Sequence, residues 1–399
     1  SLFKDVKVVD EYTVEVHLSS PYYGTLQDFT KLNPMGMMSP NAFNDDDTLS
    51  DKLSNASLGT GPYMYDGQSD GKTYTFIYNP NYLGEKPDVE KFNVKVIPDN
   101  EAKSLALRKG EIDMIFGSTK ISYDEYKAYS EDRNFGADVS DASLKTRYLC
   151  FNLAQEPFND KNVRLAVHHA IDKENICKNL FYGIETEADT FFNRSLPYCD
   201  VEVKPYEYNV EKAIQLLEKS GYVDIDGDGI REKDGKKLAG EILYISGRAV
   251  TDDLALTFTS FLKKIGMDIE VTGLDMMAWY AKIQADDFSI VNKESYEIPN
   301  DPFTGINNMN TDLKVDNALA QGLIHLENGN EVIVNLNTLV DESEIQERYN
   351  FILNEIHKNA AFVPISDMKE LVVYNAEKIE DYEFHGQPSN VNIYTLKLK

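Results

Sequence analysis

The sequence has few of the patterns from which enzyme active sites and membrane spans are usually recognised. It contains no HExxH, GxSxG or Walker-type motif, and its six histidines are scattered apart from the adjacent pair His168 and His169. These two side chains point to different faces of one predicted helix, so they do not form a joint site. No apolar run is long enough to span a bilayer. The absences argue against an enzyme and leave a hydrolase assembled from distant residues as the unfavoured alternative.

Cysteine and tryptophan are also scarce. The three cysteines, Cys150, Cys177 and Cys199, form no close-spaced metal motif, and their odd number excludes complete pairing within the chain. Cys150 lies in a strand-like run and Cys177 on a predicted helix, so we expect buried free thiols, although one pair could form a disulfide in an oxidising compartment. The single tryptophan, Trp279, is expected in the core.

Basic side chains are few relative to acidic ones. The chain has 40 lysines and arginines against 67 aspartates and glutamates, which gives a net charge of −27. Nucleic acid and anionic membrane surfaces would repel such a chain. The excess of acid favours solubility and could also favour cations. With 399 residues, the chain exceeds the size at which a single core stops growing, so two lobes are expected.

The most informative segment that is present runs from Gly59 to Pro87. It begins with the turn GTGPY, continues through the strand-like TYTFIYN (Thr73 to Asn79) and ends in NPNYLGEKP. The next residues, FNVKVI (Phe92 to Ile97), alternate apolar and polar as a half-buried strand does. Two rigid turns therefore flank one sheet segment, which is a structural signature with no catalytic group.

Together with later blocks, these residues resemble the bacterial extracellular solute-binding proteins of the dipeptide, oligopeptide and nickel class, the receptors that feed ABC importers. The later blocks, in chain order, are VIPDNEAKSLALRKGEID (Val96 to Asp113), YLCFNLAQEPFNDKNVRLAVHHAIDKENI (Tyr148 to Ile176), LPYCD (Leu196 to Asp200), DGIREKDGKKL (Asp228 to Leu238), NDPF (Asn300 to Phe303) and FVPI (Phe362 to Ile365). Within the class, DGIREKDGKKL and NALAQGL (Asn317 to Leu323) are most similar to the nickel-binding branch.

The residues and the resemblance agree on an α/β fold. Asn100 is predicted to cap a helix that ends at Gly110, and Thr251 is predicted to cap a second helix that ends at Gly266 before a strand. Helices covering a parallel sheet fit this order. The resemblance implies a two-lobed fold of the large periplasmic-binding-protein type (type II), with a hinge that the chain crosses twice. Lobe I is expected over residues 1–145, lobe II over 146–361, and a return to lobe I over 362–399.

The start of the chain is expected to be incomplete. No signal peptide or lipid-attachment cysteine stands there, and Val6 to Leu18 is predicted to be a hairpin strand that needs neighbours. The resemblance places this segment well inside the mature protein, so we expect that N-terminal strands of lobe I are missing. It also implies a location outside the cytoplasm, in the periplasm or as a cell-surface lipoprotein, and a monomer that delivers its solute to a membrane permease.

The resemblance implies a short peptide or a peptide-like metal chelate as the ligand, held in a cleft between the lobes. The alternatives are a receptor for the nickel ion itself and, in another class, a peptide hydrolase. No cofactor is required on this interpretation; nickel would enter as part of a chelate ligand. No catalytic residue is predicted.

The candidate ligand residues begin in the loop SYEIPNDPF (Ser295 to Phe303). Tyr296 lies where the nickel-type pattern has an aromatic residue, which could stack on a planar chelate or simply anchor the loop. Glu297 lies near the acid that peptide-binding relatives pair with a ligand amine, although its spacing differs and a solvated loop acid is the alternative. Asn300 shares this loop.

Two positions depart from the nickel-type pattern. Where that pattern has a metal-contacting histidine, this chain has Lys314, and a protonated lysine cannot ligate a metal. Lys314 could instead pair with a ligand carboxylate. In the loop LNPMGMMSP (Leu32 to Pro40), where the branch carries an arginine, the chain has Asn33 and Gly36. Three methionines of that loop could supply thioether ligands, form an adaptable apolar wall or fill the core: Met35, Met37 and Met38.

Two arginines are further candidate partners for a ligand carboxylate. Arg147 precedes the strand that enters the second lobe, and Arg248 lies in ISGRAV (Ile245 to Val250), a turn before a predicted helix N-terminus that favours anions. The alternative for both is a surface charge.

A possible structural calcium site lies elsewhere. Asp224, Asp226, Asp228 and Gly229 match the first half of a calcium loop, in which alternating carboxylates converge on a hard cation. The twelfth position, where the loop normally closes with an acid, is a glycine. Glu232 or Asp234 could compensate; otherwise the segment is an acidic β-turn.

Overall fold

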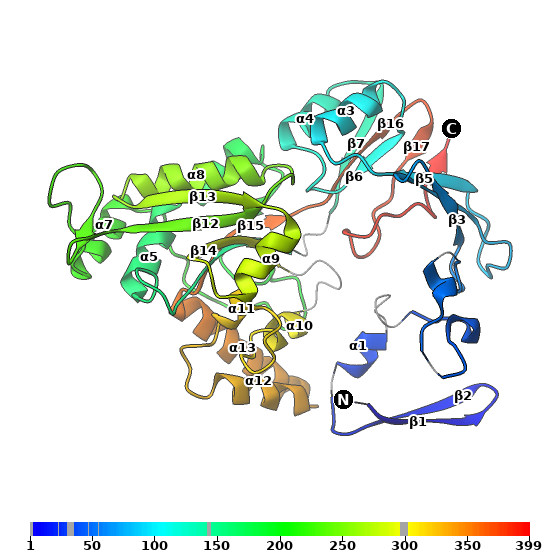
Figure 1. The fold of residues 1–399 in the computed structure, drawn as a ribbon, viewed down its shortest axis with the longest axis horizontal. Coiled ribbons are helices and arrows are strands. Elements are labelled where there is room, and N and C mark those ends of the chain that lie inside the picture. The colour runs from blue at the N-terminus through cyan, green and yellow to red at the C-terminus, as the bar shows by residue number, and fades with distance from the viewer. Residues whose placement is uncertain are drawn as a thin grey trace.

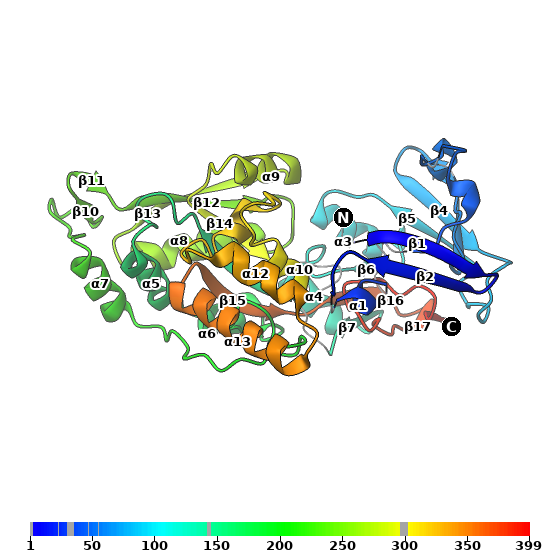
Figure 2. The same cartoon turned by 90° about the horizontal axis from the view of Figure 1, so that it is seen from below.

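The computed structural model describes residues 3–22, 24–29, 36–46, 48–54, 56–141, 145–295 and 302–399. The described chain is a mixed α/β protein with two lobes (Figure 1). The larger lobe is built on a six-stranded sheet, and the smaller lobe contains two three-stranded sheets. The view from below shows the same separation (Figure 2). None of the helices in the described ranges is long and apolar enough to cross a membrane.

The first part of the chain forms two small antiparallel units. Strands β1 (Phe3–Asp10) and β2 (Thr13–Leu18) pair only with each other. After the short helix α1 (Thr25–Phe29) and two 3-10 turns, Pro40–Ala42 and Asp51–Ser54, a sheet of order β3-β4-β5 follows. Its strands are β3 (Tyr63–Ser69), β4 (Thr73–Tyr78) and β5 (Lys91–Lys95).

The predicted turn and strand segment is confirmed. Strand β4 covers the TYTFIYN run, and the buried Asn79 that ends this run fixes the turn before it. The Asn79 side chain donates a hydrogen bond of 2.9 Å to the carbonyl of Gly61, and its backbone N–H donates one of 2.8 Å to Pro62. One asparagine thus ties the two turns together.

The smaller lobe also has a sheet of order β6-β16-β7, in which a C-terminal strand lies between two earlier ones. Its strands are β6 (Met114–Phe116), β7 (Phe135–Val139) and β16 (Leu371–Asn375), and its helices are α3 (Asn100–Arg108) and α4 (Tyr123–Ser130). Strands β17 (Ile379–Asp381) and β18 (Lys397–Leu398) form a further pair. Asp99, and not Asn100 as predicted, caps α3 with its side chain.

The six-stranded sheet has the order β13-β12-β14-β8-β15-β9. Its strands are β8 (Lys145–Phe151), β9 (Thr186–Glu187), β12 (Ala239–Ile245), β13 (Asp268–Leu274), β14 (Ile290–Glu294) and β15 (Phe362–Met368). Strand β12 is parallel to β13 and β14, whereas β8 is antiparallel to β14 and β15. The predicted parallel pairing is confirmed where the helix that begins at Thr251 connects β12 to β13, but it is wrong for β6, the strand after the helix near residue 100, which pairs antiparallel with β16. The antiparallel partners of β6 and β8 come from distant parts of the chain.

Alternate residues of β8 enter two different cores, because side chains of a strand point to opposite faces. Leu149 and Phe151 pack with the face covered by α5 (Lys161–Ala170), α7 (Val210–Lys219) and α8 (Thr251–Lys263). Tyr148 and Cys150 pack on the opposite face of the sheet, which five later helices cover. These are α9 (Met276–Gln284), α10 (Pro302–Asn307), α11 (Asn317–Ala320), α12 (Gly329–Thr338) and α13 (Glu342–Asn359). The remaining elements are α6 (Lys173–Asn175), a π-helical turn at Ile176–Leu180, β10 (Glu232–Lys233) and β11 (Lys236–Lys237).

The three cysteines are buried thiols that form no disulfide, as predicted, and Trp279 is a core residue with 8% exposure. The chain passes between the sheets twice, after β7 and again between β15 and β16. Residues 362–368 pair with β8 in the larger sheet, so the second crossing follows Met368. The residue ranges proposed for the lobes stay a prediction.

Candidate functional site

A buried network of charged side chains surrounds Arg147 on β8. The register of the sheet places Glu294 of β14 directly opposite Arg147, and Ser366 of β15 on its other side. Arg147 is 1% exposed; its Nε lies 3.0 Å from Glu185 and its Nη1 lies 2.9 Å from Glu294. The guanidinium thus joins two acids that are far apart in the sequence.

Two hydroxyls and a second arginine complete this network. The Tyr123 hydroxyl, from α4 of the smaller lobe, and the Ser366 hydroxyl both donate to Glu185. Arg248 lies 3.5 Å from the second carboxylate oxygen of Glu294. The network therefore connects α4 with the large sheet across the two lobes.

The charges in the network control its protonation. Burial alone would raise the pKa of Glu294, but the positive charges of Arg147, Lys145 and Arg248 outweigh burial and hold that pKa below its ordinary value. Burial, followed by the charge of Glu185, raises the pKa of Tyr123 well above the ordinary value. Glu294 therefore stays ionised and Tyr123 stays a hydrogen-bond donor at neutral pH.

A second buried ion pair joins the two segments that pass between the lobes. Lys145 at the start of β8 lies 2.5 Å from Glu370, which follows β15, and each is 4% exposed. The other carboxylate oxygen of Glu370 accepts from the backbone of Ser118 at 2.8 Å. The backbone N–H of Glu370 donates to the Ser140 hydroxyl at 3.0 Å. The two crossings are thus held side by side at a defined point.

The structure describes only some of the predicted ligand residues. Tyr296, Glu297 and Asn300 lie outside the described residues, as do Asn33 and Met35. Arg147 and Arg248 meet at Glu294, and the alternative of a surface charge is wrong for Arg147 because it is fully buried between two acids.

The other candidates lie apart from this network in the sheet. Lys314 is exposed in the segment between α10 and α11 and adopts a positive φ of 49°. Met37 and Met38 are 84% and 46% exposed, so the core-filling alternative is wrong for these two methionines. Their role as ligands stays a prediction, as does that of Lys314.

The sequence interpretation missed Glu185, Glu294 and Tyr123. Glu294 immediately precedes the loop SYEIPNDPF, and an acid at the end of a strand next to a candidate site was a usable signal. Glu185 and Tyr123 gave no such signal, because they reach Arg147 only through the packing of separate elements.

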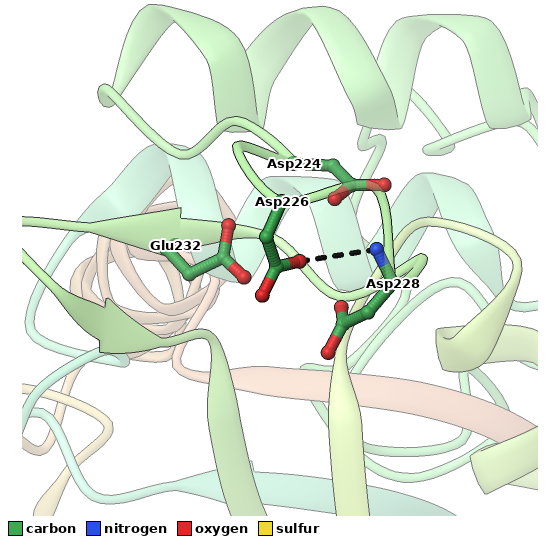
Figure 3. A group of neighbouring side chains, drawn as sticks. All are labelled: Asp224, Asp226, Asp228 and Glu232. Atoms are coloured by element: carbon green, nitrogen blue, oxygen red, sulfur yellow. Dashed lines mark hydrogen bonds between the residues drawn. The ribbon is translucent and has the colours of Figure 1, made fainter.

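A cluster of acids lies on the loop between α7 and β10 and on the first residue of β10. Asp224, Asp226, Asp228 and Glu232 each offer a carboxylate oxygen, and these oxygens lie within 4.8 Å of one another (Figure 3). Of the two acids that could complete the loop, Glu232 is therefore in the cluster.

The architecture and the hinge define a two-lobed solute-binding protein, and comparison with known families agrees. The family model described as "Bacterial extracellular solute-binding proteins, family 5 Middle" matches residues 1–317. The chain belongs to this family. The family name indicates a location outside the cytoplasm and a binding role.

Individual relatives make the likeness more specific. The chain is 30% identical over 374 residues to the nickel-binding periplasmic protein of Escherichia coli K12. The alignment covers 94% of this chain and 71% of the Escherichia coli protein. The chain is also 29% identical over 232 residues to the oligopeptide-binding protein AppA of Bacillus subtilis 168. This alignment covers 57% of this chain and 41% of AppA.

Solved structures show the same fold. NikA from Brucella suis, in complex with Fe(III)-EDTA, superposes with a TM-score of 0.91 and 28% identity over 100% of this chain and 79% of that chain. NikZ from Campylobacter jejuni superposes with a TM-score of 0.80 at 24% identity over 94% of this chain and 74% of that chain. The predicted likeness to the nickel-binding branch and the two-lobed fold are confirmed.

Proposed function

We propose that this protein is the solute-binding component of an ABC importer, and that it captures a short peptide or a peptide-like metal chelate between its lobes for a membrane permease. The observation that carries the proposal is the pair of hinge crossings joined by Lys145 and Glu370. Two segments that cross side by side permit rigid lobes to close on a ligand while the sheets stay intact. The membership of the solute-binding family supports the same conclusion.

The ligand class follows from chemistry at the predicted positions and from the names of relatives. One relative is named as nickel-binding, another as oligopeptide-binding, and a third holds an iron chelate. The ammonium group of Lys314 has no lone pair for a metal but can pair with a carboxylate of a chelator or peptide. A ligand that brings its own metal-binding atoms is therefore favoured over the bare nickel ion.

The binding residues are proposed around the loop that follows Glu294. Tyr296 would stack on the ligand, and Glu297 and Asn300 would supply polar contacts. Arg248 is the more available arginine, because its side chain is 24% exposed and its ion pair spans 3.5 Å. Arg147 would hold Glu294, and with it the base of the loop, in place. Met37 would add an adaptable apolar contact.

The working protein is proposed to be a monomer outside the cytoplasm, in the periplasm or attached to the cell surface as a lipoprotein. It has no catalytic role in this proposal, and a nickel or iron ion enters only as part of the ligand. Binding without turnover is the expected behaviour.

The first experiment is native mass spectrometry of the protein as purified, followed by metal analysis of what is released on unfolding. A released peptide or metal chelate supports the proposal. Titration calorimetry then compares three probes: nickel(II) chloride, nickel(II) with excess L-histidine, and trialanine. Saturable binding of the second or third probe, without cleavage of trialanine, is expected.

The outcomes separate the alternatives. Saturable binding of nickel(II) chloride alone would favour a nickel-ion receptor, and cleavage of the peptide would identify a hydrolase. Tyr296→Ala should weaken binding of the successful probe by about tenfold, because a stacking contact is worth on the order of 1 kcal/mol. Tyr12→Ala is the matched control, since Tyr12 is 89% exposed in the β1–β2 turn. Equal affinity of both variants contradicts the assignment of Tyr296.

A further inference from the structure

We propose that Asp224, Asp226, Asp228 and Glu232 form a calcium-binding site that is independent of the ligand site. Three of the carboxylates belong to one short loop and the fourth, Glu232, to the first residue of β10, and the four offer oxygens within 4.8 Å of one another. In both overall views this loop, between α7 and β10, lies at the end of the larger lobe that is remote from the smaller lobe (Figures 1 and 2). A cation held here would be a structural ion and not the transported solute.

The spacing agrees with a calcium loop through its first nine positions. Asp224, Asp226 and Asp228 take positions one, three and five, and Gly229, with a φ of 88°, takes the glycine position six. Position seven would contribute its backbone carbonyl. Position nine is Glu232, whose backbone pairs with Val223 in both directions at 2.8 and 3.0 Å. This pairing brings the glutamate back over the three aspartates.

The buried carboxylate of Glu232 is a second and independent indication of a cation. Glu232 is only 8% exposed, yet its Oε1 has no hydrogen-bond partner among the residues that the structure describes. Its Oε2 accepts a hydrogen bond of 3.0 Å from the backbone of Ile225. Figure 3 shows the carboxylate facing Asp226. A buried oxygen without a partner is costly, and a cation between Glu232 and the aspartates would satisfy it.

Lys237 forms an ion pair with one carboxylate of this cluster. The Lys237 ammonium lies 2.5 Å from the Oδ2 of Asp228 and is exposed to solvent. A divalent cation would compete with this ammonium for the same carboxylate. Because both groups are accessible, the ammonium can swing away into water when the cation binds.

The donor set selects the kind of metal. Only oxygen atoms are offered, which suits calcium, magnesium or manganese and disfavours soft transition metals. Calcium accepts six to eight oxygens in irregular geometry, with water completing the shell, whereas magnesium needs near-ideal octahedral geometry. An exposed loop with one buried acid therefore favours calcium, with a dissociation constant on the order of 10⁻⁴ to 10⁻³ M, as in other extracellular modules.

The test is titration calorimetry of the full chain after removal of divalent ions with a chelator. Calcium chloride is the probe, magnesium chloride is the comparison, and about 150 mM KCl screens the general attraction of a chain with a net charge of −27. One equivalent of calcium should bind with at least about tenfold preference over magnesium. The same calcium concentration should raise the melting temperature.

The variants test each step. Glu232→Gln should weaken calcium binding at least about tenfold, and Asp226→Asn, on the exposed side, should do the same if the first variant folds poorly. Asp234→Asn is the matched control: it removes one exposed charge two residues from Glu232, and its affinity should stay within about twofold. Lys237→Gln should bind calcium more tightly, by a few-fold, because it removes the competing ammonium.

Two results would overturn the proposal. One is the absence of saturable binding of one equivalent at about 10 mM calcium. The other is an equal loss of affinity in Glu232→Gln and Asp234→Asn, which would mean that calcium only screens the net charge. Neither result bears on the peptide or chelate ligand, because the acidic cluster contains only residues of the segment 224–232.

Discussion

Strand β8 and the hairpin of β1 and β2 are strands in opposite environments. All seven residues of β8, KTRYLCF, are buried, whereas all eight residues of β1, FKDVKVVD, are exposed. Strand β1 partly alternates apolar and polar side chains, as a strand with one buried face does, whereas β8 ends in the continuous apolar run YLCF, as a strand buried on both faces does. Strand β8 has a partner strand on each side and a helical layer on each face, while β1 pairs only with β2 among the described residues.

The comparison shows that the local sequence pattern determines whether a segment forms a strand, whereas the strands and helices packed around it determine how much the strand contributes to the free energy of unfolding. Valines of the hairpin keep much of their exposure, with Val8 at 73%, and so contribute little hydrophobic free energy. Even arginine is buried in β8, at the cost of requiring two acids beside it. Substitutions in the two regions should therefore differ most where burial differs most.

The largest effect is expected for Arg147→Met. This change keeps the size of the side chain but leaves Glu185 and Glu294 buried without their shared cation, which should cost about 3–5 kcal/mol in the free energy of unfolding. Arg133→Met, at an exposed position, is the control and should change it by less than about 0.5 kcal/mol. Urea unfolding of both variants makes the measurement. A loss below about 1 kcal/mol for Arg147→Met would falsify the view that this network is strongly coupled.

The next largest effect compares the loss of an apolar side chain in β8 with the same kind of loss in β1. Leu149→Ala in β8 should lower the free energy of unfolding by about 2–5 kcal/mol, because it leaves a cavity in a closed core. Val8→Ala in β1 should change it by less than about 0.5 kcal/mol. Urea unfolding again reports both values. Similar losses for the two variants would mean that the hairpin is covered in the working protein.

A smaller effect of opposite sign is expected for Asp367→Asn in β15. Burial raises the pKa of Asp367 from 3.8 to about 6 in the folded state. Above pH 6 the carboxylate is ionised in both states, so the folded protein bears the whole cost of its burial; below pH 3.8 it is protonated in both, and the cost disappears.

The variant should therefore be more stable than the parent by about 1–2 kcal/mol near neutral pH, and this gain should decline from pH 6 towards pH 4. Thermal and urea unfolding across this pH range provide the test. Asp268→Asn, at an exposed position of β13 in the same sheet, is the matched control for the loss of one carboxyl group. A gain that is constant with pH contradicts the assignment to this carboxyl group.

The smallest effect is expected for Lys7→Gln in β1. Its ammonium lies 3.8 Å from Glu15, and both side chains are about half exposed or more, at 65% and 48%. Such a pair contributes about 0.5 kcal/mol or less and is screened by salt. Unfolding at low and high salt should show a small loss that vanishes at high salt. A loss as large as that of Arg147→Met would contradict the contrast between exposed and buried ion pairs.

Features set by near neighbours in the sequence were predictable. Strand β4, the helix that begins near residue 100, and the helix from Thr251 all form where the pattern places them. The caps predicted for these two helices were wrong by one residue. Asp99, in place of Asn100, accepts the backbone hydrogen bond at the start of α3, and Val250 precedes α8, of which Thr251 is the first helical residue. Sheet direction was predicted less well, because a strand's partner is chosen by packing across the whole chain.

The candidate ligand site was only partly predictable. Arg147 and Arg248 were selected as anion partners, but their shared contact with Glu294 was not foreseen. Glu185 is 38 residues from Arg147 and Glu294 is 147 residues away, and no local spacing reports such distances. The burial of the cysteines was easier to predict, because Cys150 lies in an apolar strand-like run and Cys177 on a predicted helix.

The sequence by itself determined the family blocks, the turn and strand around Asn79, and the alternating aspartates of the 224–228 loop. These depend on residues within one or two turns of each other, whose geometry the backbone fixes directly. Only the tertiary structure decided that Arg147 is shared by two acids and that Lys145 meets Glu370. These contacts form when distant elements pack together, because burial then requires every charge to find a partner.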